Sequence, residues 1–124
     1  MRKDPGSWKG TAAEAVCDLD ALAGPLVLYE GPVREGARRY PSNVNICAAA
    51  ALAGINPDRT ELCIIADPGI ATHVVELEAE GAFGRFRFAE DVAPSDENRK
   101  TGRIVAMALT KTIRQLSVPV VIGA

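Results

Sequence analysis

The chain has 124 residues, which is enough for one domain with one sizeable core. Its formal net charge of −2 combines both signs along the sequence, so there is no electrostatic reason to expect nucleic acid or anionic lipid as a partner. No stretch approaches the roughly 20 apolar residues of a membrane span, and the basic start lacks the apolar run of a secretory signal, so neither is predicted.

The first 30 residues contain one clear signal for a regular element. Residues 1–10 show no helical period and predict an extended lead-in. Residues 14–22 predict a short, weak helix that Gly24-Pro25 ends. The apolar run 26–30 lies between Pro and Gly, which is typical of a short buried strand.

Two helices are predicted next. Pro32 suits the first position of a helix that runs through Arg39, because its missing N–H and fixed φ cost nothing there. Ser42 or Asn43 is placed to cap a second helix over residues 46–53, which contains four consecutive alanines and ends at Gly54. The alanines favour helix and leave a thin surface that another backbone can approach closely.

Residues 61–66 predict a second strand, which Asp67-Pro68-Gly69 ends. From Thr72 apolar and acidic residues alternate, which predicts a strand with one face buried and one in water. Gly81 and Gly84 mark a hairpin turn. On the return strand Phe86 and Phe88 alternate with arginines, so rows of Glu and Arg are expected to pair across the hairpin.

A last helix is predicted over residues 101–116, with Thr101 as its N-cap and one apolar face formed by Val105, Leu109, Thr112 and Leu116. The apolar tail 118–122 predicts an edge strand. Together these elements predict an α+β fold, a mostly antiparallel sheet with helices gathered on one face.

The candidate chemistry consists of a few polar residues at the ends of elements. His73 is the only histidine, and its imidazole could move protons near neutral pH or could simply be packed or lie at the surface. Of Asn43 and Asn45, one could cap the helix and the other bind a carboxamide. The cations Lys3, Lys100, Arg34, Arg38 and Arg39 could bind carboxylates or be merely solvated.

Two kinds of site have no signal in the sequence. No GxGxxG, Walker or nucleophile-elbow pattern occurs, so a dinucleotide fold would have to lie elsewhere. The three cysteines form no CxxC pair and no Cys/His cluster, which predicts reduced thiols in a cytoplasmic protein and no metal site.

Five segments in order carry a family resemblance: Leu28-Tyr29-Glu30-Gly31, Tyr40-Pro41-Ser42-Asn43-Val44-Asn45, Ala48 to Gly54, Ile65-Ala66-Asp67-Pro68 and Glu78 to Gly84. Their order and spacing resemble the C-terminal domain of the L-aspartate dehydrogenase family, from Arg2 to the last helix. The resemblance implies that residues 1–124 form one such domain and that the N-terminal Rossmann domain of the family is absent from this chain.

The resemblance also implies an activity. Members of the family oxidise L-aspartate reversibly with NAD or NADP, giving iminosuccinate and then oxaloacetate plus ammonia, and in some organisms the imine is thought to feed NAD biosynthesis. The resemblance further implies a homodimer. It places the cofactor-contacting asparagine on Asn45, at the nicotinamide end, and leaves Asn43 as the helix cap.

The resemblance assigns catalysis to a histidine, with one departure. Many bacterial members have it six residues before the glycine that matches Gly81, where this chain has Val75. His73 lies two residues earlier, on the same face of the strand, and is the expected general base. Lys3 and Lys100 are the expected partners of the substrate carboxylates. A second departure is Arg99, where the family usually has proline.

Two other interpretations stay open on the sequence. The chain could be a stand-alone domain without enzymatic activity that serves dimerisation or ligand binding, because its start at Met1 falls at the expected domain boundary. Alternatively, the displaced histidine could belong to a dehydrogenase that acts on another small amino or keto acid.

Overall fold

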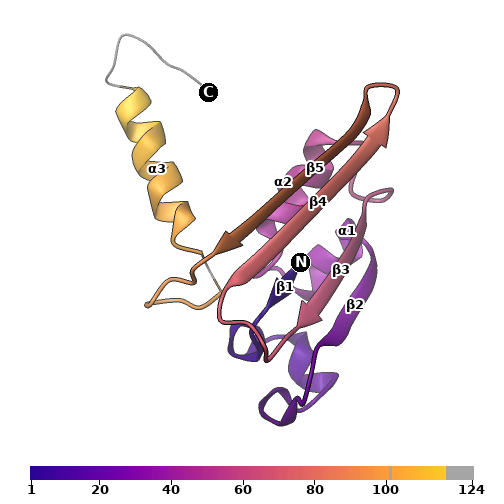
Figure 1. The fold of residues 1–124 in the computed structure, drawn as a ribbon, viewed down its shortest axis with the longest axis vertical. Helices are drawn as coiled ribbons and strands as arrows, with labels where there is room; N and C mark the ends of the chain where they lie inside the picture. Colours follow the sequence, from indigo (N-terminus) through magenta and orange to yellow (C-terminus); the bar gives the residue numbers. More distant parts are fainter. Residues whose placement is uncertain (101, 117–124) are drawn as a thin grey trace.

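The computed structural model describes residues 1–100 and 102–116, and its centre is a five-stranded mixed sheet (Figure 1). The strands follow the order β2-β3-β1-β4-β5. Their bounds are Arg2–Lys3 for β1, Leu26–Pro32 for β2, Glu61–Ala66 for β3, His73–Gly81 for β4 and Gly84–Val92 for β5. Among the strands that the structure describes, only β1 and β3 pair in parallel, so the prediction of a mostly antiparallel sheet is confirmed.

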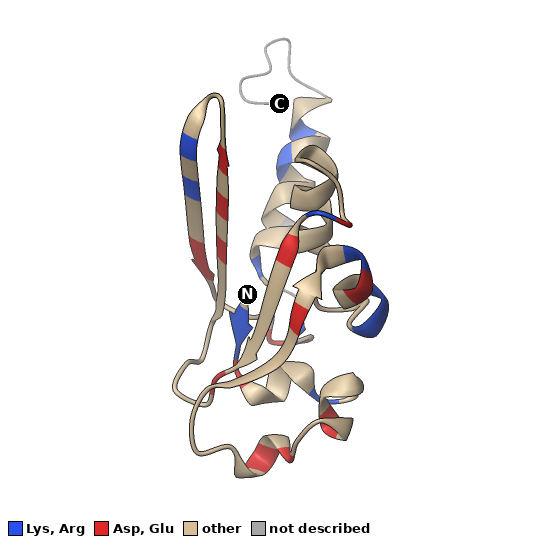
Figure 2. Cartoon of the chain, turned by 90° about the vertical axis from the view of Figure 1, so that its right-hand side faces the viewer, with Lys and Arg blue, Asp and Glu red and all other residues tan. Residues whose placement is uncertain are grey.

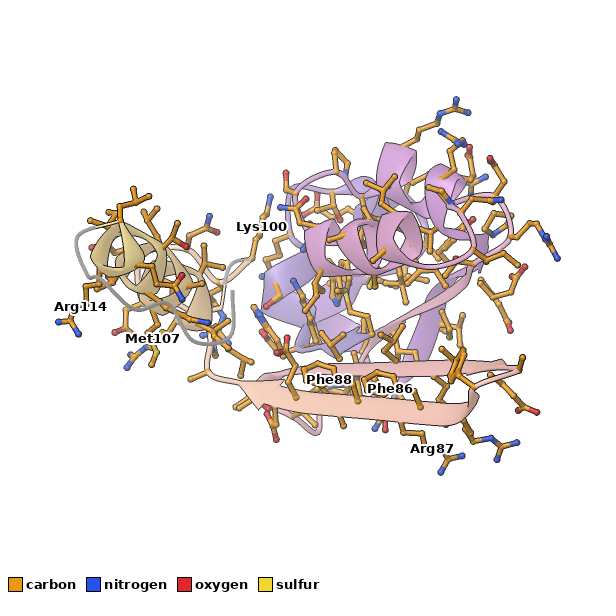
Figure 3. All side chains as sticks on the ribbon, turned by 90° about the horizontal axis from the view of Figure 1, so that it is seen from above. Phe86, Arg87, Phe88, Lys100, Met107 and Arg114 are labelled. Atoms are coloured by element: carbon orange, nitrogen blue, oxygen red, sulfur yellow. The ribbon has the colours of Figure 1, made fainter. Side chains whose placement is uncertain are left out.

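Two helices lie together behind the sheet in Figure 1, α1 over Val33–Arg39 and α2 over Asn45–Ala53. The gathering of these helices on one face was predicted. The third helix, α3 over Ile104–Gln115, stands apart from the sheet in Figures 1 and 3. Its apolar side chains are therefore exposed instead of packed, with Met107 at 68% and Leu109 at 62%.

The N-terminal residues are part of the core, so the prediction of an extended lead-in over residues 1–10 is wrong. Arg2 pairs with Ile65 on one side and with Val74 on the other, which makes β1 the central strand. Trp8 follows in a 3-10 turn, Pro5–Trp8, and is fully buried edge-on against Tyr40, with ring centroids 5.6 Å apart. A two-residue strand is too short to show an alternation of apolar and polar residues, so the sequence pattern does not reveal it.

The short helix predicted over residues 14–22 is also absent. Two 3-10 turns take its place, Ala12–Ala15 and Leu19–Ala21. The side chains of Thr11 and Asp18 accept hydrogen bonds from backbone N–H groups two residues further on. Such local side-chain caps stabilise tight turns at the expense of a continuous helix.

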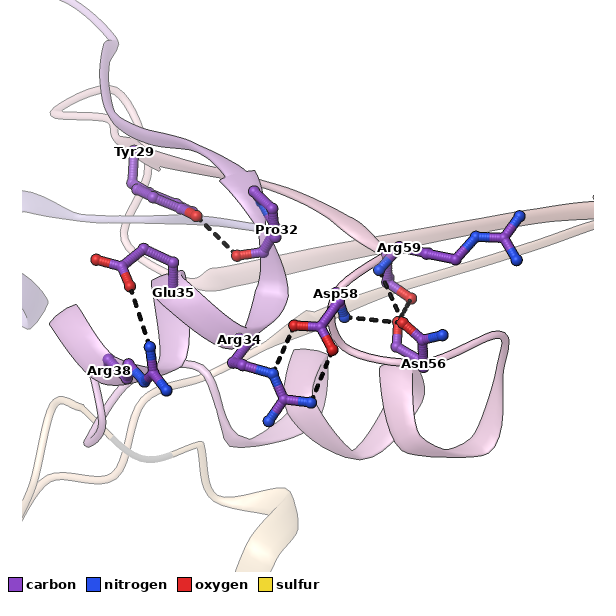
Figure 4. Close-up of polar contacts among 9 residues, drawn as sticks. Tyr29, Pro32, Arg34, Glu35, Arg38, Asn56, Asp58 and Arg59 are labelled. Atoms are coloured by element: carbon purple, nitrogen blue, oxygen red, sulfur yellow. Dashed lines mark hydrogen bonds and ion pairs between the residues drawn. The ribbon is translucent and has the colours of Figure 1, made fainter.

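The junction of α1 with the β3 side of the sheet is fastened by polar contacts (Figure 4). The Arg34 guanidinium binds the Asp58 carboxylate through two nitrogens, and Arg39 pairs with Glu35 within the helix. Asn56 accepts two backbone N–H bonds and forms the predicted turn before β3. These arginines, considered above as ligands for substrate carboxylates, are thus paired with carboxylates of the chain itself.

Strands β4 and β5 form the predicted hairpin, in register from His73↔Val92 to Gly81↔Gly84. In Figure 2 acidic residues colour β4, whereas β5 has basic residues toward the turn and acidic ones at its base. The pairs Glu80–Arg85 at 2.9 Å and Glu78–Arg87 at 3.0 Å bridge the two strands. The predicted burial of one face holds only near its base, since Val75 is buried but Phe86 is 49% exposed.

Two predictions for the C-terminal part, the N-cap Thr101 and the edge strand 118–122, lie outside the described residues. The last helix itself is confirmed, although it begins at Ile104 instead of residue 101. None of the helices among the described residues is long and apolar enough to cross a membrane.

Candidate active site

A cavity of about 130 Å³ lies where β1, the base of the hairpin, the start of α2 and the segment before α3 meet. All four residues predicted for the site, Lys3, Asn45, His73 and Lys100, line it. They come from four separate segments of the chain, and the central position of β1 places Lys3 between the segments that carry the others. The fold therefore collects at one place the residues that the sequence only suggested individually.

Lys3 is buried in the floor of this cavity, at 4% exposure. Its Nζ donates to the carbonyl oxygens of Asn43, at 3.1 Å, and Lys100, at 3.0 Å, and lies 5.7 Å from the centre of the Trp8 ring. Burial lowers the pKa of Lys3 to about 8, although the negative charge of Asp4 opposes the shift. An ammonium has three N–H groups, so one remains for a ligand in the cavity.

His73 opens β4 and is buried at 4% exposure. Its Nε2 lies 3.1 Å from the hydroxyl oxygen of Ser7. The pKa of His73 is lowered below its ordinary value, mainly by burial and then by the positive charge of Lys3. The imidazole is therefore neutral at pH 7 and able to accept a proton.

Ser7 joins this histidine to two residues that sequence reasoning missed. Its hydroxyl lies 2.6 Å from Asp4 Oδ2 and 3.0 Å from the Arg99 carbonyl oxygen, while the Arg99 guanidinium binds Asp4 Oδ1 at 3.0 Å. Ser7 is fully buried and Asp4 nearly so. No sequence motif indicates this network, because the 3-10 turn that contains Ser7 and follows Asp4 is too short to show a periodic pattern.

Asn43 does not cap α2, which corrects the sequence-based prediction. The N-cap position is Val44, and no side chain caps this helix. The Asn43 amide instead turns into the core, where Nδ2 donates to the Ser7 carbonyl at 2.8 Å. That bond fixes the orientation of the amide, since its oxygen cannot face a carbonyl. Its Oδ1 is buried, has no hydrogen-bond partner within residues 1–100 and 102–116, and can accept from a ligand.

Asn45 and Lys100 complete the wall of the cavity. Asn45 is the first residue of α2 and is exposed, which leaves its amide available. Lys100 is half-buried, projects from the segment between the sheet and α3 (Figure 3), and gives its carbonyl oxygen to Lys3. Asp67, at the end of β3, accepts from Gly69 N at 2.8 Å and pairs with Arg2, so it stabilises a turn as the sequence suggested.

Comparison with known proteins fixes the family. A family model described as "Aspartate dehydrogenase, C-terminal" matches residues 1–116. The chain belongs to this family. The match confirms the resemblance to the aspartate dehydrogenase C-terminal domain that five short segments indicated from Arg2 to the last helix.

Comparison with individual proteins gives the same family. The chain is 46% identical over 114 residues to an L-aspartate dehydrogenase of Ruegeria pomeroyi, covering 92% of the chain and 42% of that protein. It is 43% identical to L-aspartate dehydrogenase 3 of Bordetella bronchiseptica, and the match covers 98% of this chain and 45% of that protein. The chain thus spans less than half the length of these curated relatives.

A solved structure confirms the fold of the domain. The crystal structure of an aspartate dehydrogenase from Thermotoga maritima superposes with a TM-score of 0.62 at 23% identity, covering 98% of this chain and 44% of that one. The arrangement of a mixed sheet backed by helices is therefore that of a known enzyme structure.

Proposed function

We propose that this chain is the substrate-binding and catalytic domain of an NAD(P)-dependent L-aspartate dehydrogenase, which converts L-aspartate to iminosuccinate and then to oxaloacetate plus ammonia. One observation carries the proposal. In a chain of this family, a buried histidine, a buried lysine, a second lysine and a free amide from four separate segments line a single cavity. A small dicarboxylic amino acid needs that combination of cations and a base.

His73 is the general base in this proposal. During aspartate oxidation it takes a proton from the substrate ammonium, and it then activates the water that attacks the imine to give oxaloacetate and ammonia. Because the pKa of His73 is lowered by burial and by Lys3, the imidazole is neutral and ready to accept that proton at pH 7. Its position two residues before Val75 keeps it in the cavity, since both side chains line the same space.

Lys3 and Lys100 bind the two carboxylates of the substrate. Lys3 is held by two backbone carbonyls, so its remaining N–H is directed by the fold and not by solvent. A carboxylate placed beside it compensates the burial of the ammonium and restores the pKa of Lys3 toward its ordinary value. Lys100 is half-buried, lines the same cavity and is proposed as the partner of the second carboxylate.

The nicotinamide end of the cofactor fits the amides at the start of α2. A carboxamide has both donors and an acceptor, and the cavity offers the exposed amide of Asn45 and the unpartnered oxygen of Asn43. Asn45 would hold this end, and the cofactor, when bound, takes up the hydride from the substrate α-carbon. The rest of the dinucleotide belongs to a Rossmann domain, which we place in the part of the relatives that this chain does not span.

We further propose that the enzyme acts in the cytoplasm as a homodimer. Support comes from the exposed apolar side chains of α3 and from the small side chains of α2. Cys47 and Ala50 of α2, with Val75, Leu77 and Phe88 of the hairpin, line an apolar groove of about 110 Å³. A second copy would cover apolar area that is otherwise left in water.

The deciding experiment is NADH and NADPH oxidation by the full-length gene product with oxaloacetate, with and without ammonium. Consumption that requires ammonium supports the proposal and names the preferred cofactor. Consumption without ammonium identifies a hydroxy-acid dehydrogenase and overturns the substrate assignment. No consumption by a folded protein that contains the Rossmann half overturns the enzymatic proposal.

A further inference from the structure

The hydroxyl of Ser7 has one proton and three polar neighbours. Asp4 Oδ2 lies 2.6 Å away, the Arg99 carbonyl oxygen 3.0 Å away and His73 Nε2 3.1 Å away. A carboxylate and a carbonyl can only accept hydrogen bonds, whereas a ring nitrogen can do either. Ser7 is fully buried, so its hydroxyl has no contact with bulk solvent.

The proton count selects one arrangement. If Ser7 donated to His73 Nε2, its oxygen would face the Asp4 carboxylate at 2.6 Å with no proton between them, which is strongly unfavourable in a buried site. With the hydroxyl proton on the Asp4 side, the short distance becomes that of a charge-assisted hydrogen bond. A lone pair of Ser7 then faces Nε2, and Nε2 must carry a proton to use it.

The Asp4 carboxylate is itself held in place. Its second oxygen binds the Arg99 guanidinium at 3.0 Å, and the turn that contains it is closed by the bond from Ser7 N to Asp4 O at 3.1 Å. The backbone of Gly6 passes so close that an added Cβ would lie 2.9 Å from Asp4 Oδ1. The carboxylate therefore has one orientation, and it imposes the orientation of the hydroxyl.

From this geometry we propose that Asp4 and Ser7 are positioning residues that hold His73 with its proton on Nε2, leaving Nδ1 as the basic nitrogen. The inference rests on the proposed function, because it specifies which atom of the general base takes the substrate proton. Asp4 orients the Ser7 hydroxyl, and Ser7 in turn orients the proton of His73. Neither Asp4 nor Ser7 needs to contact the substrate.

The charges around the imidazole determine what each variant should do. Lys3 and Arg99 disfavour the protonated ring, whereas Asp4 and the carbonyl of Arg99 favour it, and Glu90 of β5 lines the same cavity. Removing the Asp4 charge should therefore lower the pKa of His73 further. Because Ser7 lies between them, we expect a shift of roughly half to one unit, smaller than for a direct ion pair.

Nitrogen-15 NMR of the imidazole tests the inference directly. The chain contains one histidine, and His73→Gln identifies its signals in any longer form of the protein. Above its pKa, the wild-type ring should show a protonated Nε2 and an unprotonated Nδ1. A wild-type ring protonated on Nδ1 would overturn the proposal without any variant having to fold.

Two variants and a control test the pKa and the protonated nitrogen of His73, which a purely structural effect of the substitutions would not change in the expected way. Asp4→Asn should lower the pKa of His73, and Ser7→Ala should weaken the preference for protonated Nε2. Asp96→Asn also removes a carboxylate paired with an arginine, Arg103, but at an exposed site, and should change neither quantity. Equal shifts in Asp4→Asn and Asp96→Asn, or none in either, would contradict the relay.

Turnover separates this inference from the proposed function. In the full-length enzyme the acidic limb of the pH profile of kcat should move to lower pH in Asp4→Asn by the same amount as the NMR shift. Protonated Nε2 in a protein without ammonium-dependent turnover would leave the relay in place and remove the proposed activity. Ammonium-dependent turnover by an enzyme whose His73 is protonated on Nδ1 would support the proposed activity and overturn the relay.

Discussion

At the scale of single residues, His73 combines three properties that a general base needs. It is buried, its pKa lies below the ordinary value, and one of its nitrogens is engaged by Ser7 while it lines the cavity with Lys3 and Asn45. This combination makes the loss of His73 a sharp test.

We predict that His73→Ala in the full-length enzyme lowers kcat by about 100-fold or more, because positioned acid–base groups contribute at least that much. Binding of NADH should change far less, since the proposed cofactor contacts belong to Asn45. Steady-state kinetics and NADH fluorescence titration measure the two quantities. Parallel losses in both would show that the residue merely supports the structure.

Lys3 gives a prediction for stability. Its pKa is about 8 in the folded chain and 10.5 when unfolded, so the folded state binds fewer protons between these values and stability rises with pH there. The stabilisation grows by about 2 kcal/mol between pH 7 and 9.5. Lys3→Met removes it, and the groups that lie far from Lys3 titrate alike in both proteins. Urea unfolding of both proteins at several pH values measures the difference, and a constant difference would refute the shift.

The predictability of these residues from sequence was uneven, for physical reasons. His73 and Lys3 are uncommon residue types at such positions, and a family motif pointed to Asn45. Ser7 and Asp4 gave no signal, because a buried hydroxyl and carboxylate are recognised only by the partners that folding brings to them. The Asn43 amide was misjudged as a cap, since its true partner, the Ser7 carbonyl, is 36 residues away in sequence.

At the scale of elements, the fit of α1 against the sheet depends on one missing side chain. A Cβ at Gly36 would lie 2.6 Å from a methyl group of Leu62 and 2.9 Å from the Tyr29 ring. Leu62 and Tyr29 are both buried, so they have little room to move. The close approach of helix and sheet is therefore possible only with glycine at this position.

We predict that Gly36→Ala destabilises the fold by about 1–3 kcal/mol through overpacking, despite the higher helix propensity of alanine. Gly24→Ala is the matched control, because no atom lies within 4 Å of a Cβ there, and it should be neutral or slightly stabilising. Chemical denaturation of both variants gives the comparison. A Gly36→Ala protein as stable as the control would mean that α1 can shift away from β3.

Elements with strong patterns were predictable, and the weak ones were not. Strands β2 and β3, helix α2 and the hairpin follow from apolar runs, alanine content and alternation bounded by glycine and proline. Strand β1 was missed, because two residues carry no period and its pairing partners lie about 60 residues away. The predicted helix 14–22 failed, because local caps favour 3-10 turns over propagation.

At the scale of the whole molecule, α3 requires a partner surface. An isolated helix of its length is marginal in water, and its Leu109, Ile113 and Leu116 side chains are all more than half exposed. In the proposed homodimer a second copy covers this apolar face. The apolar face of α3 could be predicted from the sequence, but the surface that packs against it could not. The amphipathic pattern of a helix does not identify the partner to which its apolar face is complementary.

We predict that Leu109→Gln weakens self-association by tenfold or more, as expected for an apolar residue at the centre of an interface. Arg114→Gln, on the same helix, is the control and should leave the association constant unchanged. Sedimentation analysis over a range of concentrations measures both. An unchanged dimer in Leu109→Gln would show that α3 packs elsewhere, and a wild-type monomer at all concentrations would remove the dimer itself.

The central strand also sets the order of folding. Arg2 and Lys3 are synthesised before β3 and β4, yet their neighbours in the sheet are residues of those strands, which follow roughly 60 to 70 residues later. Pairing over such a separation is slow, because the loop must close before any contact rewards it. The same late step joins β3 to β4 and brings Lys3 and Ser7 to His73. A partly folded chain in which these pairings have not formed therefore lacks the cavity that Lys3 and His73 line.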